Sequence, residues 1–372
     1  MALLRYIRNK KETFDESPVN QLDVLAFTWL TYFDLRPLDS HLPVRIGDLK
    51  GTDFDKNLEK LHQTWVPSIS AKLFRAMMDS PRYRDAEIIR NEETSDVPGV
   101  YQFGAIAVRA GGKVIVAYEG TDLSAIGWRE DCVMSYSDKI GSYPIADRFY
   151  EEVTAATTEP IIISGHSKGG NVAVYVAAKT ADASRVEKVY SYDGPGFHNS
   201  DVFAEHPERE ALVTKYIPQG SIVGILLNSN AHCTIVRSYS IGVFQHNAIK
   251  WSIEGDDFIH VDKLSLSSRF LDAAANQWIS ELAPEEKARF VELLFGPLGD
   301  QKISMSTLFK DLARSAPALA LAFRDMAKED RRFMFLVIKQ FAKTIHQTGR
   351  ASLGFNKPLA ATSNPKPKKN KQ

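Results

Sequence analysis

Apolar residues in the first part of the chain recur at the three- and four-residue spacing of a helix. Residues 20–36 show this pattern behind Asn20, a residue type that caps helix N-termini, and predict a helix packed on the body of the protein. Residues 57–79 predict a second helix, interrupted near Pro67 because proline lacks the amide hydrogen that a helix interior uses. The polar run "NEETSDVPG" that follows predicts a loop.

The pattern becomes that of strands after this loop. The segments "VYQFGAIAV" and "KVIVAYE" flank "RAGG", which is the arrangement of a β-hairpin. Five further strand segments follow, namely "PIIIS", "VEKVYSY", "VTKYIP", "CTIVRSYS" and "AIKWSI". The segment "GNVAVYVAAKT", which comes just after "PIIIS", is apolar on nearly all sides and predicts an enclosed helix. Strands and helices in this order predict a mostly parallel α/β sheet with flanking helices.

Helical patterns dominate beyond about Ser265. Three segments carry them, residues 267–282, 284–296 and 305–345, and the Pro-, Asn- and Lys-rich end predicts disorder. We therefore divide the chain into a main domain with its N-terminal helices (1–262), a helical C-terminal extension (263–350) and a disordered basic tail (351–372). Composition alone leaves open whether the extension is a lid or an interaction module.

Composition and charge place the chain among ordinary globular proteins. Hydrophobic residues make up 44% and charged residues 25%, which excludes a chain that is disordered throughout. Two cysteines are too few for a disulfide framework and suit a reducing compartment. The N-terminus has no apolar core long enough for a secretory signal, and no apolar run reaches membrane-spanning length. We expect a cytoplasmic protein.

The chemistry centres on Gly165-His166-Ser167-Lys168-Gly169, a Gly-x-Ser-x-Gly sequence. The pentapeptide alone is a weak signal, but here a buried strand precedes it and a helix follows it. That context is typical of a sharp turn that exposes a nucleophilic serine hydroxyl, with glycines where the backbone approaches closely. A tight turn or a phosphate-binding loop is the alternative, although the spacing of a Walker loop is absent. Ser167 is the candidate nucleophile.

An oxyanion needs two hydrogen-bond donors. The backbone N–H of Lys168, directly after the serine, is one candidate, and Thr121 in "VIVAYEGTD" is the other. We expect His166 to be a packed, structural residue. The side chain of Lys168 is either solvated near the mouth of the site or buried, and a buried charge there would favour anionic substrates.

In these segments the chain resembles the Mbeg-like family of bacterial lipase-like α/β-hydrolases, which is related to the class 3 lipases. The resemblance spans about residues 3–260 and rests on "VIVAYEGTDLSAIGWREDCVMSY", "ISGHSKGGNVAVYVAA", "YSYDGPGF", "SIVGILL" and "QHNAIKW" in this order. It implies an α/β-hydrolase fold and a role for Trp128 and Asp131 in buttressing the oxyanion loop. The chain departs from the class 3 pattern at Glu119, where those lipases usually carry arginine.

A serine nucleophile needs a histidine base, and the base needs a carboxylate that orients it. His246 in "GVFQHNAIKW" follows a strand, and the family resemblance indicates the same residue. His232 and His260 are its rivals, and a buried structural histidine is the other interpretation of His246. His206 and His346 lie in segments that we expect to be solvated.

The candidate acid follows from a count of carboxylates. No Asp or Glu occurs between Ala211 and Ile253, so the loop in which class 3 lipases place their acid has none. If the chain order Ser, acid, His holds, the acid comes earlier, and Asp193 in "YDGPGF" is the best candidate. Asp201 and Glu205 are alternatives, and Asp193 could instead be a turn residue.

The sequence therefore predicts a serine hydrolase of lipase or esterase type that cleaves carboxylic esters through an acyl-enzyme on Ser167. The alternative is a non-catalytic binding or scaffold protein with the same fold. We expect no cofactor and no metal, because Cys and His lack ligand spacing. The expected partner is a small-molecule ester or lipid. The basic tail allows weak contact with anionic surfaces or serves only solubility, and we expect no specific nucleic acid.

Overall fold

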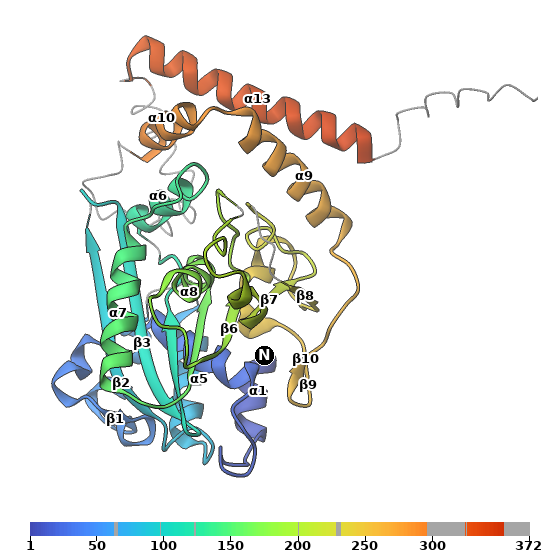
Figure 1. Ribbon diagram of the computed structural model, residues 1–372. Coiled ribbons are helices and arrows are strands. Elements are labelled where there is room, and N and C mark those ends of the chain that lie inside the picture. The colour runs from blue at the N-terminus through green and yellow to red at the C-terminus, as the bar shows by residue number, and fades with distance from the viewer. Residues whose placement is uncertain are drawn as a thin grey trace, which may run out of the picture.

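The computed structural model describes residues 1–62, 66–96, 98–122, 124–199, 201–227, 232–295, 324 and 326–352. Within these residues eight strands form one sheet in sequence order, antiparallel from β1 to β4 and parallel from β4 to β8 (Figure 1). The strands are β1 Val44–Arg45, β2 Glu87–Asp96, β3 Tyr101–Ala110, β4 Lys113–Tyr118, β5 Ile161–His166, β6 Val186–Tyr192, β7 Val213–Pro218 and β8 Cys233–Val236.

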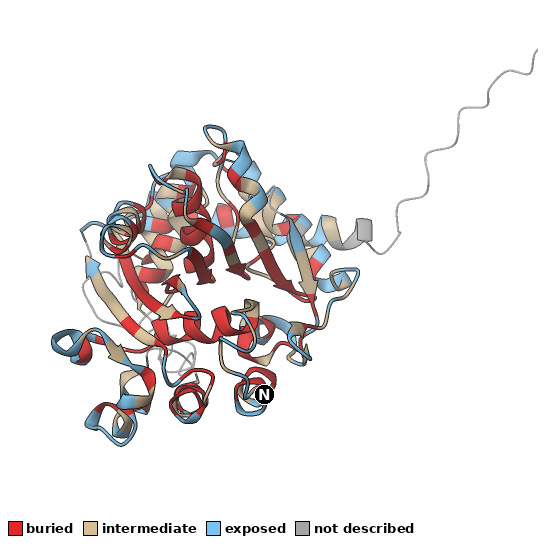
Figure 2. Ribbon diagram, turned by 60° about the horizontal axis from the view of Figure 1, so that its bottom comes forward, coloured by how far each residue is buried: buried red, intermediate tan, exposed pale blue. Residues whose placement is uncertain are grey.

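The predicted hairpin is confirmed as β3 and β4. Gly111 and Gly112 join the two strands with φ of 55° and 69°, a conformation that glycine adopts without steric cost. Side chains of β4 then alternate between two hydrophobic clusters, with Val114 and Val116 on one face and Ile115 on the other. Both faces of the central sheet are therefore buried, as the red central strands in Figure 2 show.

Helices cover both faces. One face packs against α7 and α8, and the opposite face packs against the N-terminal helices α1, α2 and α5 (Figure 1). Before β9 the α-helices are α1 Ala2–Asn9, α2 Gln21–Thr28, α3 Asp53–Lys56, α4 Leu58–Leu61, α5 Pro67–Asp79, α6 Ala125–Val133, α7 Ser142–Ala156 and α8 Lys168–Lys179.

The N-terminal helix predictions hold in their main features. Asn20 caps α2 by accepting hydrogen bonds from the amides of Leu22 (2.9 Å) and Asp23 (3.2 Å). The helix continues as the 3-10 turn Trp29–Tyr32. The second helix is split into α4 and α5, and Pro67 occupies the first turn of α5, where its missing amide hydrogen costs nothing.

Two predictions were wrong, one of a loop and one of a possible last strand. The polar run expected to be a loop contributes residues 91–96 to β2, which pairs with β3 along its length. The segment "AIKWSI" is not a sheet strand. It forms the 3-10 turn Ala248–Lys250 and then β9 (Ile253–Glu254), which pairs only with β10 (Asp257–Phe258). The fully buried Trp251, whose indole N–H donates to the carbonyl of Gln245 (2.7 Å), fixes this turn.

The C-terminal extension contains α9 (Leu266–Glu281), α10 (Pro284–Phe295) and α13 (Lys328–Ser352). Trp278 of α9 contacts Phe290 of α10 and Phe341 of α13, so an aromatic cluster joins the three helices. They lie together at the top of Figure 1, beyond the edge of the sheet near α6. Residues 305–323 of the predicted third helix and residues 353–372 of the predicted tail lie outside the described residues.

A mostly parallel sheet with helices on both faces, and a strand–serine–helix turn between β5 and α8, is an α/β-hydrolase fold. That prediction is confirmed, while the division into domains stays a prediction. None of the helices in the described part of the chain combines the length and apolarity needed to cross a bilayer.

Candidate active site

The topology brings the predicted site residues to one edge of the sheet. Thr121 follows β4, Ser167 follows β5, Asp193 follows β6, and His246 lies in the 3-10 turn Gly242–His246 after β8. Parallel strands end at the same edge, and α/β sheets bind their ligands outside these carboxyl ends.

Ser167 sits in a strained turn. Its φ of 58° and ψ of −129° lie in a region that costs a residue with a side chain roughly 1–3 kcal/mol. The flanking glycines are required by contact: a Cβ on Gly165 would lie 2.0 Å from the carbonyl oxygen of Gly169. A Cβ on Gly169 would lie 2.2 Å from the carbonyl oxygen of Tyr118. A residue larger than glycine therefore does not fit at position 165 or 169, and this close packing holds Ser167 in its strained conformation.

Asp193 and His246 form a direct pair. Oδ2 of Asp193 lies 2.6 Å from Nδ1 of His246, and the carboxylate is fully buried. Its other oxygen accepts hydrogen bonds from the Ser221 hydroxyl (2.6 Å) and the Gly224 amide (3.1 Å). Contacts to His246, Ser221 and Gly224 therefore fix the position of this carboxylate.

The Ser167 hydroxyl and His246 are not hydrogen-bonded to each other in this structure, in which both residues are described. The Ser167 residue is 8% exposed and the His246 side chain 28% exposed. Such bonds are often long without substrate and shorten when it binds.

His166 connects the nucleophile turn to the histidine loop. Its Nε2 lies 2.7 Å from the carbonyl oxygen of His246, which can only accept, so Nε2 carries the proton. Its Nδ1 then accepts from the Tyr32 hydroxyl at 2.5 Å. Burial, and then the nearby His246, hold the pKa of His166 well below its usual range. His166 is therefore a neutral, packed residue, as its position before the serine suggested.

The loop after β4 lies against the candidate nucleophile Ser167, since a Cβ on Gly120 would come within 2.9 Å of Cβ of Ser167. The Thr121 hydroxyl donates to Oδ2 of Asp131 at 2.6 Å. The other oxygen of Asp131 is buried without a hydrogen-bond partner among the described residues. Burial raises the pKa of Asp131 to about 7. Asp131 thus contacts the loop after β4 directly, and both Asp131 and Trp128 line the cavity beside Ser167.

The side chain of Lys168 is buried, and its charge is balanced. Nζ donates to Oε2 of Glu130 (2.7 Å) and to Oε1 of Gln102 (3.0 Å). Burial alone would lower the pKa of Lys168, but Glu130 and Asp131 raise it above its ordinary value. An ammonium paired in this way adds little net potential at the oxyanion, which argues against a Lys168 preference for anionic substrates.

Glu119, which stands where the class 3 lipases usually carry arginine, comes directly before Gly120 and Thr121. Its side chain is buried, and burial raises the pKa of its carboxyl group above the usual range. Nε2 of Gln102 donates to it at 2.7 Å. The hydrogen bond from Gln102 thus holds the buried Glu119 side chain next to the loop after β4.

The rival residues lie elsewhere. Asp201 and His232 are exposed, and His232 precedes β8, at the sheet edge opposite the site. Glu205 pairs with Lys179 (3.2 Å), and His260 faces Asp257 (3.5 Å) with half of its side chain exposed. Among the candidate acids and bases after Ser167, the structure brings together only Asp193 and His246 within the described residues.

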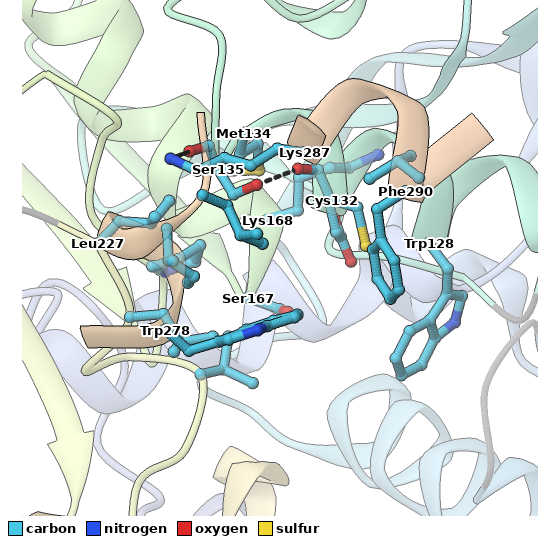
Figure 3. Close-up of a pocket in the computed structure, with 17 residues that line it drawn as sticks. Trp128, Cys132, Met134, Ser135, Ser167, Lys168, Leu227, Trp278, Lys287 and Phe290 are labelled. Carbon is cyan, nitrogen blue, oxygen red and sulfur yellow. Dashed lines mark hydrogen bonds between the residues drawn. The ribbon is translucent and has the colours of Figure 1, made fainter. Parts of the chain in front are cut away.

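A cavity of about 270 Å³ opens beside Ser167 (Figure 3). Its walls come from α6, from the segments after β6 and β7, and from α9 and α10 of the C-terminal extension. Most lining side chains are apolar, among them Leu227, Trp278 and Phe290. The C-terminal helices therefore build part of the candidate site. No cluster of three or more potential metal ligands occurs in the described parts of the chain.

Several contributors to the site could not be predicted individually. Tyr32, Glu130 and Ser221 are linked to it by hydrogen bonds that span 134, 38 and 28 positions of the chain. No local pattern marks them.

Three comparisons bear on this chain. The model of the Mbeg1-like family matches residues 77–296. A crystal structure of a fungal lipase is similar at 15% sequence identity with a TM-score of 0.39, covering 64% of this chain and 88% of the lipase chain. No curated protein matches.

Proposed function

The chain belongs to the Mbeg1-like family, and from this premise we propose that it is a serine hydrolase of the lipase or esterase type that cleaves carboxylic esters. The observation that carries the proposal is the 2.6 Å contact between the buried Asp193 and His246, at the sheet edge where the strained Ser167 lies. A nucleophile, a base and an acid that orients the base are what acyl transfer requires, and here they lie in the segments that follow β5, β8 and β6.

The proposed reaction has two steps. Ser167 Oγ attacks the ester carbonyl carbon while Nε2 of His246 takes the hydroxyl proton, and the departing alcohol then receives this proton. Water next attacks the acyl-enzyme, again losing a proton to His246, and the carboxylic acid leaves as Ser167 is restored. Asp193 holds the imidazole in the tautomer with Nδ1 protonated and stabilises the imidazolium.

The backbone amides of Thr121 and Lys168 are the proposed donors to the oxyanion. Lys168 begins α8, whose first amides have no partner within the helix and point toward developing negative charge. The Thr121 hydroxyl donates to Asp131, so its backbone amide is the group we assign to the oxyanion.

The size and the mostly apolar lining of the cavity suit an apolar acyl or alcohol group of the substrate. A cavity of about 150 Å³ holds benzene, so by proportion the 270 Å³ here suits about ten carbon atoms. We expect p-nitrophenyl octanoate or decanoate to be cleaved with higher kcat/KM than the butyrate or palmitate, and the Ser167→Ala variant to cleave none of them. A folded wild-type protein that binds these esters without turnover would favour the non-catalytic alternative.

A further inference from the structure

Lys287 is a buried lysine in the wall of the cavity. It lies in the first turns of α10, is only 8% exposed, and lines the same cavity as Ser167 (Figure 3). Most of the side chains that line this cavity are apolar.

No carboxylate among the described residues forms an ion pair with Lys287. Its one described hydrogen bond, drawn in Figure 3, runs to the carbonyl oxygen of Ser135 at 3.5 Å, the outer limit of such a bond. Lys168, the other lysine of this cavity, is neutralised by Glu130 at 2.7 Å. Among the described residues, the cavity therefore has one ammonium group with a carboxylate partner, that of Lys168, and one without, that of Lys287.

An unbalanced buried charge is costly, because the group loses water without gaining a counter-ion. Burial accordingly lowers the pKa of Lys287. A cation in this situation, placed in a cavity beside a nucleophile, is suited to meet a negative charge that a ligand supplies.

We propose that Lys287 binds an anionic group of the substrate, a carboxylate or a phosphate, while an apolar body fills the cavity and the ester lies at Ser167. The substrate is then an anionic amphiphile with one ester bond. Asp131 lines the same cavity and accepts a hydrogen bond from Thr121, the residue that follows Gly120 beside Ser167. The assignment of the ester to Ser167 rests on the proposed hydrolase function.

Binding tests the anion site without catalysis. Isothermal titration calorimetry compares octyl phosphate with octanol on the full-length protein. We expect octyl phosphate to bind at least tenfold more tightly, Lys287→Met to remove the preference, and Lys287→Arg to retain it. Lys339→Met, which removes an exposed lysine of α13, is the matched control and should behave as wild type. Equal affinities for the two ligands in the wild-type protein would overturn the proposal even if Lys287→Met does not fold.

Kinetic measurements distinguish an anionic group on the acyl chain of the substrate from one on the alcohol. The p-nitrophenyl half-ester of suberic acid against p-nitrophenyl octanoate tests a charge on the acyl chain, and 1-octanoylglycerol 3-phosphate against 1-octanoylglycerol tests a charge on the alcohol. We expect one anionic ester to be preferred, and Lys287→Met to lower its kcat/KM about 30-fold or more with the neutral partner nearly unchanged. If all four esters are inert while the protein still binds octyl phosphate more tightly than octanol in a way that depends on Lys287, the hydrolase proposal fails and the anion site stands. If esters are cleaved but Lys287→Met changes kcat/KM of the anionic and the neutral ester of each pair by the same factor, the anion site is refuted and the hydrolase proposal stands.

Discussion

Replacing Asp193 with asparagine removes the charge of the proposed acid while keeping its shape. Asp193 has a φ of 50°, a left-handed conformation that asparagine tolerates better than most residues, so we expect Asp193→Asn to fold. The amide can still accept the two hydrogen bonds that Ser221 and Gly224 donate to the carboxylate. The change therefore tests the contact to His246 without emptying the site.

The size of the effect follows from these contacts. If the amide oxygen stays on Ser221 and Gly224, its NH₂ group faces Nδ1 of His246 and stabilises the tautomer whose Nε2 already carries a proton. That tautomer cannot take the proton of Ser167. If the amide turns around, the Gly224 N–H loses its acceptor, at about 1–3 kcal/mol, and the charge-assisted bond to the imidazolium, worth about 1.5–3 kcal/mol, is lost as well. Together these amount to about 2.5–6 kcal/mol, or roughly 10²- to 10⁴-fold in kcat.

The assay is the initial rate of hydrolysis of the preferred p-nitrophenyl ester, with thermal melting as the check on folding. Asp201→Asn and Glu205→Gln remove the charges of the alternative acids, which are exposed, and should change kcat less than twofold. Asp193 is not the acid if kcat of Asp193→Asn falls less than tenfold, or if kcat of either control falls as much as that of Asp193→Asn.

Two predictions concern stability, each measured as the free energy of unfolding in urea. Because burial raises the pKa of Asp131 to about 7, the folded chain holds that proton more tightly than the unfolded chain, and stability falls as pH rises from about 4 to 7. The advantage of Asp131→Asn over wild type in the free energy of unfolding should therefore grow by about 2–3 kcal/mol as pH rises from roughly 5 to 8, whereas an advantage that stays constant would argue against the raised pKa of Asp131. Helix propensity alone predicts that Gly169→Ala gains about 1 kcal/mol, but the Cβ clash should make it lose about 1–3 kcal/mol or more. Gly51→Ala, at φ 75° with nothing within 4 Å of the added Cβ, measures the cost of backbone strain without a clash. A Gly169→Ala variant whose free energy of unfolding is not lowered would disprove the clash.

The sequence was informative where short patterns determine structure. The hairpin at Gly111 and Gly112, the strand before Ser167 and the helix after it all follow from local spacing and close approach. Asp193 and His246 were reached by chain order, family resemblance and the absence of carboxylates between residues 211 and 253, and the structure places them in contact.

Other features depend on contacts between distant segments. Residues 91–96 form part of β2 because β3 offers a pairing edge, although their polar side chains resemble a loop. Trp251 is in the core and fixes a 3-10 turn where a strand was expected. The pairing of Lys168 with Glu130 and the position of Lys287 in the cavity wall both require helices that only the tertiary fold brings to the serine.

The central claim is that Ser167 is an activated nucleophile, and labelling with a fluorophosphonate probe tests it most directly. The folded wild-type protein should become covalently labelled, peptide mass spectrometry should place the adduct on Ser167, and the labelling should disappear in Ser167→Ala. A folded wild-type protein that stays unlabelled, or a Ser167→Ala variant that labels as fast as wild type, would contradict the claim.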